Sequence, residues 1–247
     1  MSELHDIVRD WWDADADSYD ASAGHAMSDP VEAAAWTAAL RALLPAPPGA
    51  VLDVGAGTGS LSLTAAELGF DVTGIDLSDA MLARARAKAA ARDLHATFLH
   101  RPAEDPPGGP FDAVIERHVS WTLPDPVAAL RAWRGATRQG GVLVLCEGSW
   151  GGEGPLMALR DTAAARIERC YGVPDDHHAA YPEAVIARMP LARTTSPAPF
   201  IDAVREAGWS TVRLYRLRDV EWAIARRQPW PLGWLTHRPR YAIVASA

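Results

Sequence analysis

Residues 51–59 read Val-Leu-Asp-Val-Gly-Ala-Gly-Thr-Gly, and this stretch decides the fold. The apolar residues before the first glycine indicate a short buried strand, and apolar residues recur at helical spacing after the last glycine. Glycine suits a sharp turn from strand to helix in which the backbone must approach a ligand, because it has no Cβ. The stretch therefore predicts a strand, a ligand-binding turn and a helix.

Two acidic residues lie at the carboxyl ends of neighbouring predicted strands. Asp53 stands two residues before Gly55, and a second strand over residues 70–75 is followed by Asp76. Open α/β sheets bind ligands at the carboxyl ends of their strands, and an acid in the position of Asp76 can accept hydrogen bonds from both hydroxyls of a ribose. The glycine turn and the two acids together predict a site for a nucleotide-like cofactor.

The spacing of the glycines distinguishes two such cofactors. A dinucleotide loop needs the pattern Gly-x-Gly-x-x-Gly, which would place its third glycine at position 60, where the chain has Ser60. The carboxylate of Asp53 would also repel a pyrophosphate, whereas it suits a ligand with an ammonium group, such as a methionyl amine. The pattern favours S-adenosylmethionine (SAM) over NAD.

Residues 52–59, Leu-Asp-Val-Gly-Ala-Gly-Thr-Gly, and residues 74–78, Gly-Ile-Asp-Leu-Ser, closely resemble the first two motifs of class I SAM-dependent methyltransferases. The resemblance covers most of residues 45–147 and 198–247, and it implies SAM as the cofactor. It assigns the methionyl end of SAM to Asp53, Gly55, Gly57 and Thr58, the ribose to Asp76, and the adenine to Leu77, Ala103 and Glu104. Tyr19 resembles the tyrosine of an N-terminal Tyr-Asp element that closes over the methionyl end in related enzymes.

The third motif departs from the family pattern. Pro102 stands where the family often has an acid, which leaves Ala103 and Glu104 as the adenine contacts. Met81, in the first turns of the helix after Asp76, either packs on the adenine face or belongs to the core.

The residues after the fourth predicted strand narrow the acceptor. The run Glu116-Arg117-His118-Val119 lacks the (Asp/Asn/Ser)-Pro-Pro-aromatic tetrad of enzymes that methylate amino groups of nucleic-acid bases. A metal-dependent catechol methyltransferase needs an Asp here and a later Asp-Asn pair, which the chain lacks. The resemblance thus implies a metal-independent enzyme that methylates a small molecule, with Arg117 and His118 at the junction of cofactor and acceptor.

His118 is the candidate catalytic residue, either as a general base or as part of the pocket wall. Trp121, Trp150, His177 and His178 are the candidate acceptor contacts. Tryptophan is unusually frequent, with ten in 247 residues, and aromatic faces can hold a flat acceptor or attract a cation. Several more tryptophans fall in segments expected near the mouth of the pocket, namely Trp11, Trp12, Trp222, Trp230 and Trp234.

The alternation of patterns predicts an α/β fold with a Rossmann-like seven-stranded sheet, mostly parallel with an antiparallel C-terminal strand, plus N-terminal helices and a helical lid insertion. Strands are expected near residues 50–54, 70–75, 95–100, 111–115, 141–146, 210–218 and 240–246. The chain is interpreted as a single domain, with an N-terminal helical lid (1–45), a SAM-binding core (46–147), a helical insertion that caps the substrate (148–198), and a closing helix and β-hairpin (199–247). No helix is expected between the last two strands.

Composition limits the remaining functions. The net charge of −7 disfavours a nucleic-acid enzyme, because neutralising phosphates needs a basic face. Residues 1–20 lack the apolar core of a signal peptide, and no apolar run is long enough to span a membrane. Two cysteines form no disulfide framework, and no metal-ligand spacing is present. The sequence therefore predicts a cytoplasmic protein without a metal, and it leaves the choice between monomer and homodimer open.

The hypothesis that these patterns support is a methyltransferase acting on a small aromatic or heteroaromatic acceptor in bacterial secondary metabolism. Two alternatives stay open: a non-catalytic SAM-binding regulatory module and an NAD-dependent oxidoreductase. A third variant keeps SAM and methylates a protein or peptide.

Overall fold

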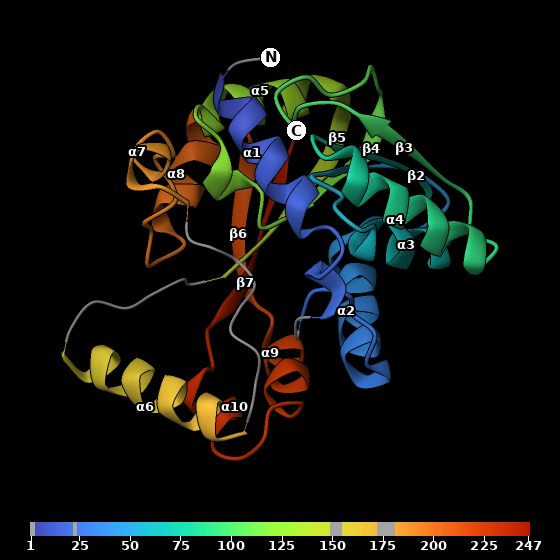
Figure 1. Ribbon diagram of the computed structural model, residues 1–247. Coiled ribbons are helices and arrows are strands. Elements are labelled where there is room, and N and C mark those ends of the chain that lie inside the picture. The colour runs from blue at the N-terminus through green and yellow to red at the C-terminus, as the bar shows by residue number, and fades with distance from the viewer. Residues whose placement is uncertain (1–2, 22–23, 149–154, 172–180) are drawn as a thin grey trace.

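Seven strands form one sheet in the order β3-β2-β1-β4-β5-β7-β6 (Figure 1). The computed structural model describes residues 3–21, 24–148, 155–171 and 181–247. Strands β1 to β5 pair in parallel, and β7 is antiparallel to both of its neighbours, β5 and β6. The predicted fold class is confirmed. The strands are β1 (Ala50–Val54), β2 (Asp71–Asp76), β3 (Ala96–His100), β4 (Phe111–Arg117), β5 (Thr137–Gly148), β6 (Ser210–Arg216) and β7 (Arg240–Ser246).

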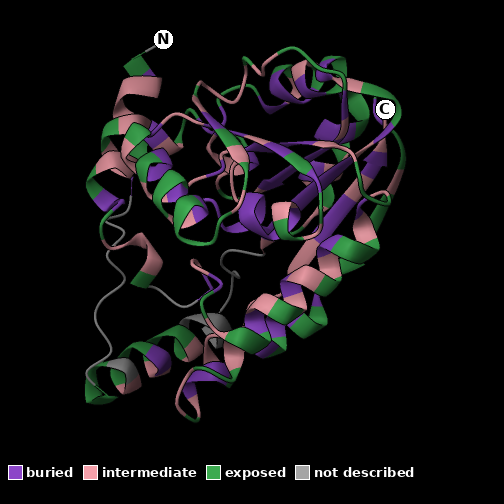
Figure 2. Cartoon of the chain, turned by 90° about the vertical axis from the view of Figure 1, so that its right-hand side faces the viewer, coloured by how far each residue is buried: buried purple, intermediate pink, exposed green. Residues whose placement is uncertain are grey.

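Helices cover both faces of the sheet, and their buried sides face the strands (Figure 2). Helices α2, α3 and α9 pack together on one face of the sheet, and α5 and α8 pack on the opposite face. Helix α4 packs on α3 and on strand β3. These helices are α2 (Pro30–Leu43), α3 (Ser60–Glu67), α4 (Asp79–Ala91), α5 (Pro126–Ala136), α8 (Ala198–Glu206) and α9 (Arg218–Ala225). The helices predicted after the glycine turn and after Asp76 are confirmed as α3 and α4.

The core lies on both sides of the central strands. In β1, Val51 packs in the cluster that contains Trp36 of α2, while Leu52 packs in the cluster that contains Trp133 of α5. Successive strand residues point to opposite faces, so a strand buried on both faces is apolar without alternation. Cys146 of β5 is 1% exposed and belongs to the cluster that contains Trp36, so it packs as a small apolar residue.

The prediction of two final strands without an intervening helix is wrong. Helices α9 and α10 (Leu232–Leu235) lie between β6 and β7. Val220 and Ala223 of α9 are buried, and Val220 packs in the cluster that covers α2. At eight residues, α9 gives only a short helical pattern in the sequence, and packing against α2 stabilises the helix.

The helices outside the sheet form two separate groups. Helix α1 (Glu3–Asp15) packs with the segment around α7 (Glu183–Ile186) in a cluster of Leu4, Tyr181, Val185 and Met189. Helix α6 (Pro155–Tyr171) packs instead on α10, away from the sheet (Figure 1). The part of the predicted insertion that reaches α1 is therefore the segment around α7. None of the described helices combines the length and the apolar composition that crossing a bilayer requires.

Candidate functional site

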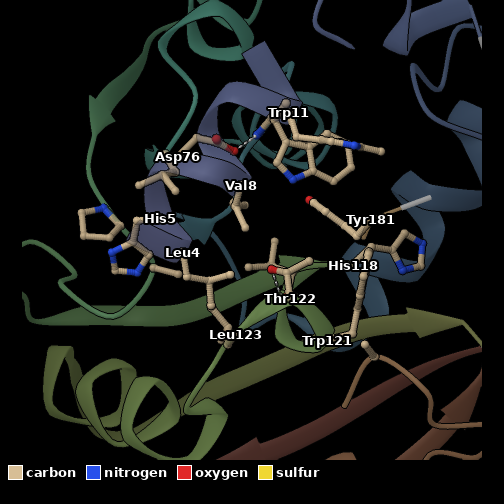
Figure 3. A pocket seen from close by; sticks show the side chains of 18 of the residues that line it. Leu4, His5, Val8, Trp11, Asp76, His118, Trp121, Thr122, Leu123 and Tyr181 are labelled. Carbon is tan, nitrogen blue, oxygen red and sulfur yellow. Dashed lines mark hydrogen bonds between the residues drawn. The ribbon is translucent and has the colours of Figure 1, made fainter. Parts of the chain in front are cut away.

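A cavity of about 490 Å³ lies at the carboxyl ends of β1, β2 and β4. Figure 3 shows side chains of α1, of the short helix η2 (Ser120–Thr122) and of the segment at Tyr181 around it. Eleven of the predicted site residues line it: Tyr19, Gly55, Gly57, Asp76, Leu77, Met81, Ala103, Glu104, Arg117, His118 and Trp121. Asp53 and Thr58 line a smaller adjoining cavity that shares Tyr19, Gly55, Gly57 and Arg117. Trp150, His177 and His178 lie outside the described residues.

The glycine turn leaves open space toward the cavity. Gly55, Gly57 and Gly59 have φ values of +64°, +54° and +83°. A Cβ on Gly57 would meet only the backbone oxygen of Gly55, 4.0 Å away. A backbone with empty space beside it is what the close approach of a cofactor requires. The turn therefore fits the predicted methionyl end of SAM.

Asp76 is held by backbone donors at the end of β2. Its carboxylate accepts hydrogen bonds from the N–H of Gly57 at 2.8 Å and from the N–H of Ser78 at 2.8 Å. Burial raises the pKa of Asp76, and these backbone hydrogen bonds oppose the rise. Each carboxylate oxygen can accept more than one hydrogen bond. The side chain is thus fixed in place with capacity left for two ribose hydroxyls.

Asp53 is 1% exposed and accepts a hydrogen bond from the Ser62 hydroxyl at 2.5 Å. Burial raises the pKa of Asp53 to about 7, although the bond from Ser62 and the charge of Arg117 oppose this rise. An ammonium group brought beside this side chain would favour its ionised form. The position therefore fits the amino end of the predicted cofactor.

Acidic residues at the end of α1 and just after it bind residues of the glycine turn and of α4. The Ser78 hydroxyl donates to Asp13 at 2.5 Å, and Asp20 accepts from the Thr58 hydroxyl at 2.7 Å while pairing with Lys88 at 2.6 Å. These contacts hold the N-terminal segment over the glycine turn and α4. They also show that the hydroxyl of Thr58 binds the N-terminal segment.

Arg117 fixes the same segment from the sheet side. Its guanidinium donates to the carbonyl oxygens of Gly24 and His25 at 2.9 and 2.8 Å. The ring of His25 stacks on that of Tyr19 with centroids 4.3 Å apart. Because Arg117 lines both cavities, its positive charge borders the predicted site for the methionyl end of SAM.

The two predicted adenine contacts, Ala103 and Glu104, are each held by a contact with another element. The carbonyl oxygen of Ala103 accepts a hydrogen bond from Trp133 Nε1 at 2.7 Å. The carboxylate of Glu104 lies 3.2 Å from His5 Nε2 of α1. Met81 is 2% exposed, so it both lines the cavity and belongs to the packed interior.

His118 lines the cavity, but both of its ring nitrogens lie within hydrogen-bond distance of other side chains. Nδ1 lies 3.3 Å from Glu147 Oε2, and Nε2 lies 2.9 Å from a guanidinium nitrogen of Arg240, which can only donate. Burial, followed by the charges of Arg240 and Arg117, lowers the pKa of His118 well below its ordinary value. The imidazole is therefore neutral at pH 7, and its lone pair already accepts a charged donor.

Two buried acids, Glu116 and Glu147, were not among the site residues predicted from the sequence. Glu116 is 0% exposed and accepts hydrogen bonds from the N–H groups of Val119 and Ser120 at 2.8 and 3.2 Å, which fixes η2 in the cavity wall. Burial raises the pKa of Glu116 to about 8 and that of Glu147 well above its usual range. The sequence pattern that could have indicated them is an acid near the end of each of two apolar strands, β4 and β5.

The tryptophans expected near the pocket fall into two groups in the structure. Trp11, Trp12 and Trp121 line the cavity. Trp222, Trp230 and Trp234 do not, since they lie in α9, in the loop after it and in α10, where they are 62%, 85% and 75% exposed. Their separation from the site follows from the unpredicted helices between β6 and β7.

The buried acids predict an alkaline loss of stability. A raised pKa in the folded state means that the folded chain binds protons more tightly than the unfolded chain, so stability is lost as the pH rises through the folded values. For Asp53 and Glu116 these values are about 7 and about 8. We expect the free energy of unfolding of the cofactor-free protein to fall by at least ~1 kcal/mol from pH 6.5 to 9, or roughly 2–4 °C in melting temperature. Thermal unfolding followed by circular dichroism measures this.

The matched variant is Asp53→Asn, whose side-chain oxygen can still accept from Ser62. It should show a smaller alkaline loss than the unmodified chain. A melting temperature that is constant or rises over this range would contradict the assignment.

Comparison with known proteins agrees with this geometry. Residues 51–141 match a family described as "Methyltransferase domain". The ubiquinone biosynthesis O-methyltransferase of Xanthomonas campestris pv. campestris is 37% identical over 228 residues, which cover 91% of this chain and 82% of that protein.

Two solved structures have the same fold. One concerns the conversion of a disulfide bond into a thioacetal group during echinomycin biosynthesis (TM-score 0.54, 25% identity, 85% of this chain and 80% of that chain). The other is phosphoethanolamine N-methyltransferase 2 of Haemonchus contortus with phosphomonomethylethanolamine and S-adenosylhomocysteine (TM-score 0.66, 16% identity, 100% of this chain and 60% of that chain).

Proposed function

The chain belongs to the class I SAM-dependent methyltransferases, and from this premise we propose that it methylates an oxygen atom of a small aromatic acceptor. The observation that carries the proposal is the cavity itself, which runs from the glycine turn and Asp76 to an aromatic wall of Trp11, Trp121 and Tyr181. We favour oxygen over nitrogen and carbon as the methylated atom because of the Xanthomonas campestris relative. The alignment with this chain covers 82% of that protein, which is named an O-methyltransferase.

Different residues around the glycine turn bind different parts of the cofactor in this proposal. SAM supplies an electrophilic methyl group on a sulfonium. We assign the ribose hydroxyls to Asp76, the amino end to Asp53 and the carboxylate end to Arg117. The N-terminal segment that carries Tyr19 covers this part of the cavity and excludes water from it.

The acceptor half of the cavity is built to hold a flat apolar molecule. Leu4, Val8, Trp121 and Leu123 provide apolar surface there (Figure 3). Most of the rate enhancement of a methyl transfer can come from holding the two reactants close and aligned. Rigid aromatic walls serve this purpose because they lose little conformational entropy on binding.

We assign His118 a positioning role in the cavity wall. Because its pKa is depressed and its Nε2 accepts from Arg240, it is a poor proton acceptor in this arrangement. His118→Gln should lower kcat by less than about 10-fold, since the amide can accept from Arg240 and donate to Glu147. Loss of a general base would cost about 10²–10⁴-fold.

The measurement is kcat as a function of pH for the unmodified chain and for His118→Gln, with exposed His95→Gln as the control. A loss of 100-fold or more, together with the disappearance of a titration near neutral pH, would make His118 the base instead.

The experiment that tests the function uses SAM with a labelled methyl group and a panel of single-ring and two-ring phenols, catechols, hydroxyquinones, anilines and aliphatic alcohols. We expect label in a phenolic oxygen, shown by mass spectrometry of the product. Transfer to anilines or aliphatic alcohols in preference to phenols would reject the proposal.

The place of the reaction in secondary metabolism is a further part of the proposal. It is supported by the likeness to the structure from echinomycin biosynthesis and by the aromatic acceptor cavity. A metal-independent reaction is proposed from the residue types of the site. Across the described ranges, no group of three or more His, Cys, Asp or Glu side chains could hold a metal ion.

A further inference from the structure

Tyr181 carries a buried hydroxyl that sequence reasoning did not select. Its side chain lines the cavity and is 6% exposed. Within the described part of the chain, the proton of this hydroxyl has no hydrogen-bond acceptor. A buried polar group without a partner costs about 1–3 kcal/mol, so such groups in folded proteins usually have a ligand or water to satisfy them.

The ring of Tyr181 is held rigidly. It stacks on Trp11 of α1 with centroids 4.5 Å apart and an interplanar angle of 25°, and it meets Trp121 edge-on at 6.0 Å. Val185 and Met189 pack in the same cluster. Figure 3 shows the hydroxyl end of Tyr181 directed into the cavity. The position of this hydroxyl is therefore set before any acceptor binds.

The hydroxyl is a donor in this setting. Burial raises the pKa of Tyr181 above its ordinary value, and a hydrogen bond from the indole N–H of Trp12 to the same oxygen only partly opposes the rise. An indole N–H can donate but not accept, so the proton of the phenol still needs an acceptor.

Three other polar side chains of the cavity are engaged elsewhere. The hydroxyl of Thr122 donates to the carbonyl oxygen of Val119 at 2.8 Å, and His5 lies 3.2 Å from Glu104. His118 contacts Glu147 and Arg240.

We propose that Tyr181 selects the acceptor by donating a hydrogen bond to an oxygen of a flat aromatic molecule, such as a ring carbonyl or an ether. This inference rests on the proposed function and adds a requirement to it: the acceptor carries a hydrogen-bond-accepting oxygen besides the atom that is methylated. A site with an unpaired buried donor discriminates strongly against a ligand that cannot pair with it.

Two isosteric probes test the inference without knowledge of the natural acceptor. 2-Acetylnaphthalene and 2-isopropenylnaphthalene carry the same flat two-ring system and differ in composition only by C=O against C=CH₂. Their dissociation constants are measured by calorimetry in the presence of saturating S-adenosylhomocysteine, for the unmodified chain, for Tyr181→Phe and for the control Tyr215→Phe. Tyr215 lies on β6 and is 40% exposed, outside the residues that line the cavity.

The expected result is a preference for the ketone that falls about 5- to 20-fold in Tyr181→Phe, through weaker ketone binding alone. The control should keep the full preference, and the affinity for S-adenosylhomocysteine should be unchanged in both variants, which also shows that they fold. A preference that survives in Tyr181→Phe would overturn the inference and leave the proposed function standing. Binding of neither probe to the S-adenosylhomocysteine complex would instead reject the acceptor cavity, and with it both proposals.

Discussion

Gly55→Ala should lower the affinity for SAM at least 100-fold. The backbone at Gly55 has φ +64°, a conformation that costs an L-residue roughly 1–2 kcal/mol. A Cβ there would also collide with a methyl group of Val119 and lie 3.1 Å from its Cβ. Relief of this collision must move the glycine turn or the wall at η2, and both border the cofactor site. Calorimetric titration with S-adenosylhomocysteine measures the effect.

Gly140→Ala separates backbone strain from the collision. Gly140 has φ +74°, and a Cβ on it would meet nothing within 4 Å. This variant should lose a similar amount of stability from strain yet bind S-adenosylhomocysteine normally. If Gly55→Ala binds within 3-fold of the unmodified chain, the turn does not contact the cofactor as assigned.

Asp76→Ala should weaken SAM binding by about 10- to 100-fold. The carboxylate would provide charge-assisted acceptors for the ribose hydroxyls, and loss of such bonds costs roughly 1–3 kcal/mol. The substitution also leaves the N–H groups of Gly57 and Ser78 without their acceptor, which loosens the glycine turn. Both effects act in the same direction.

The matched control is Asp71→Ala, at the opposite, exposed end of the same strand. It should leave affinity unchanged. Thermal stabilisation of each variant by SAM, S-adenosylhomocysteine and NAD reports binding, since a ligand that binds the folded state raises the melting temperature. Full stabilisation of Asp76→Ala by SAM would place the ribose elsewhere.

Much of the cofactor side could be predicted because its signals are local. Strand β1, the turn at Gly55–Gly59 and the start of α3 are continuous in sequence, and positive φ values restrict the turn to glycine. The regular alternation of strands and helices then brings Asp53 and Asp76 to the same edge of a parallel sheet. No long-range information is needed for this step.

The acceptor side could not be predicted in the same way. Tyr181 reaches the cavity only because the segment around α7 packs on α1, more than 160 residues away in the chain. The partners of His118 come from β5 and β7, and nothing in the local sequence shows that its nitrogens bind Glu147 and Arg240. The same limit applies to Trp222, Trp230 and Trp234, whose exposure depends on how α9 and α10 pack.

The sequence by itself therefore determined the sheet, the glycine turn and the acids at the strand ends. Apolar periodicity, the conformational freedom of glycine and the direction of parallel strands are properties of short segments. Only the tertiary structure decided which hydroxyl faces the acceptor, which histidine nitrogens are occupied and how far burial shifts the pKa of each acid. These depend on burial and on contacts between distant segments, because desolvation and hydrogen bonding act through space and not along the chain.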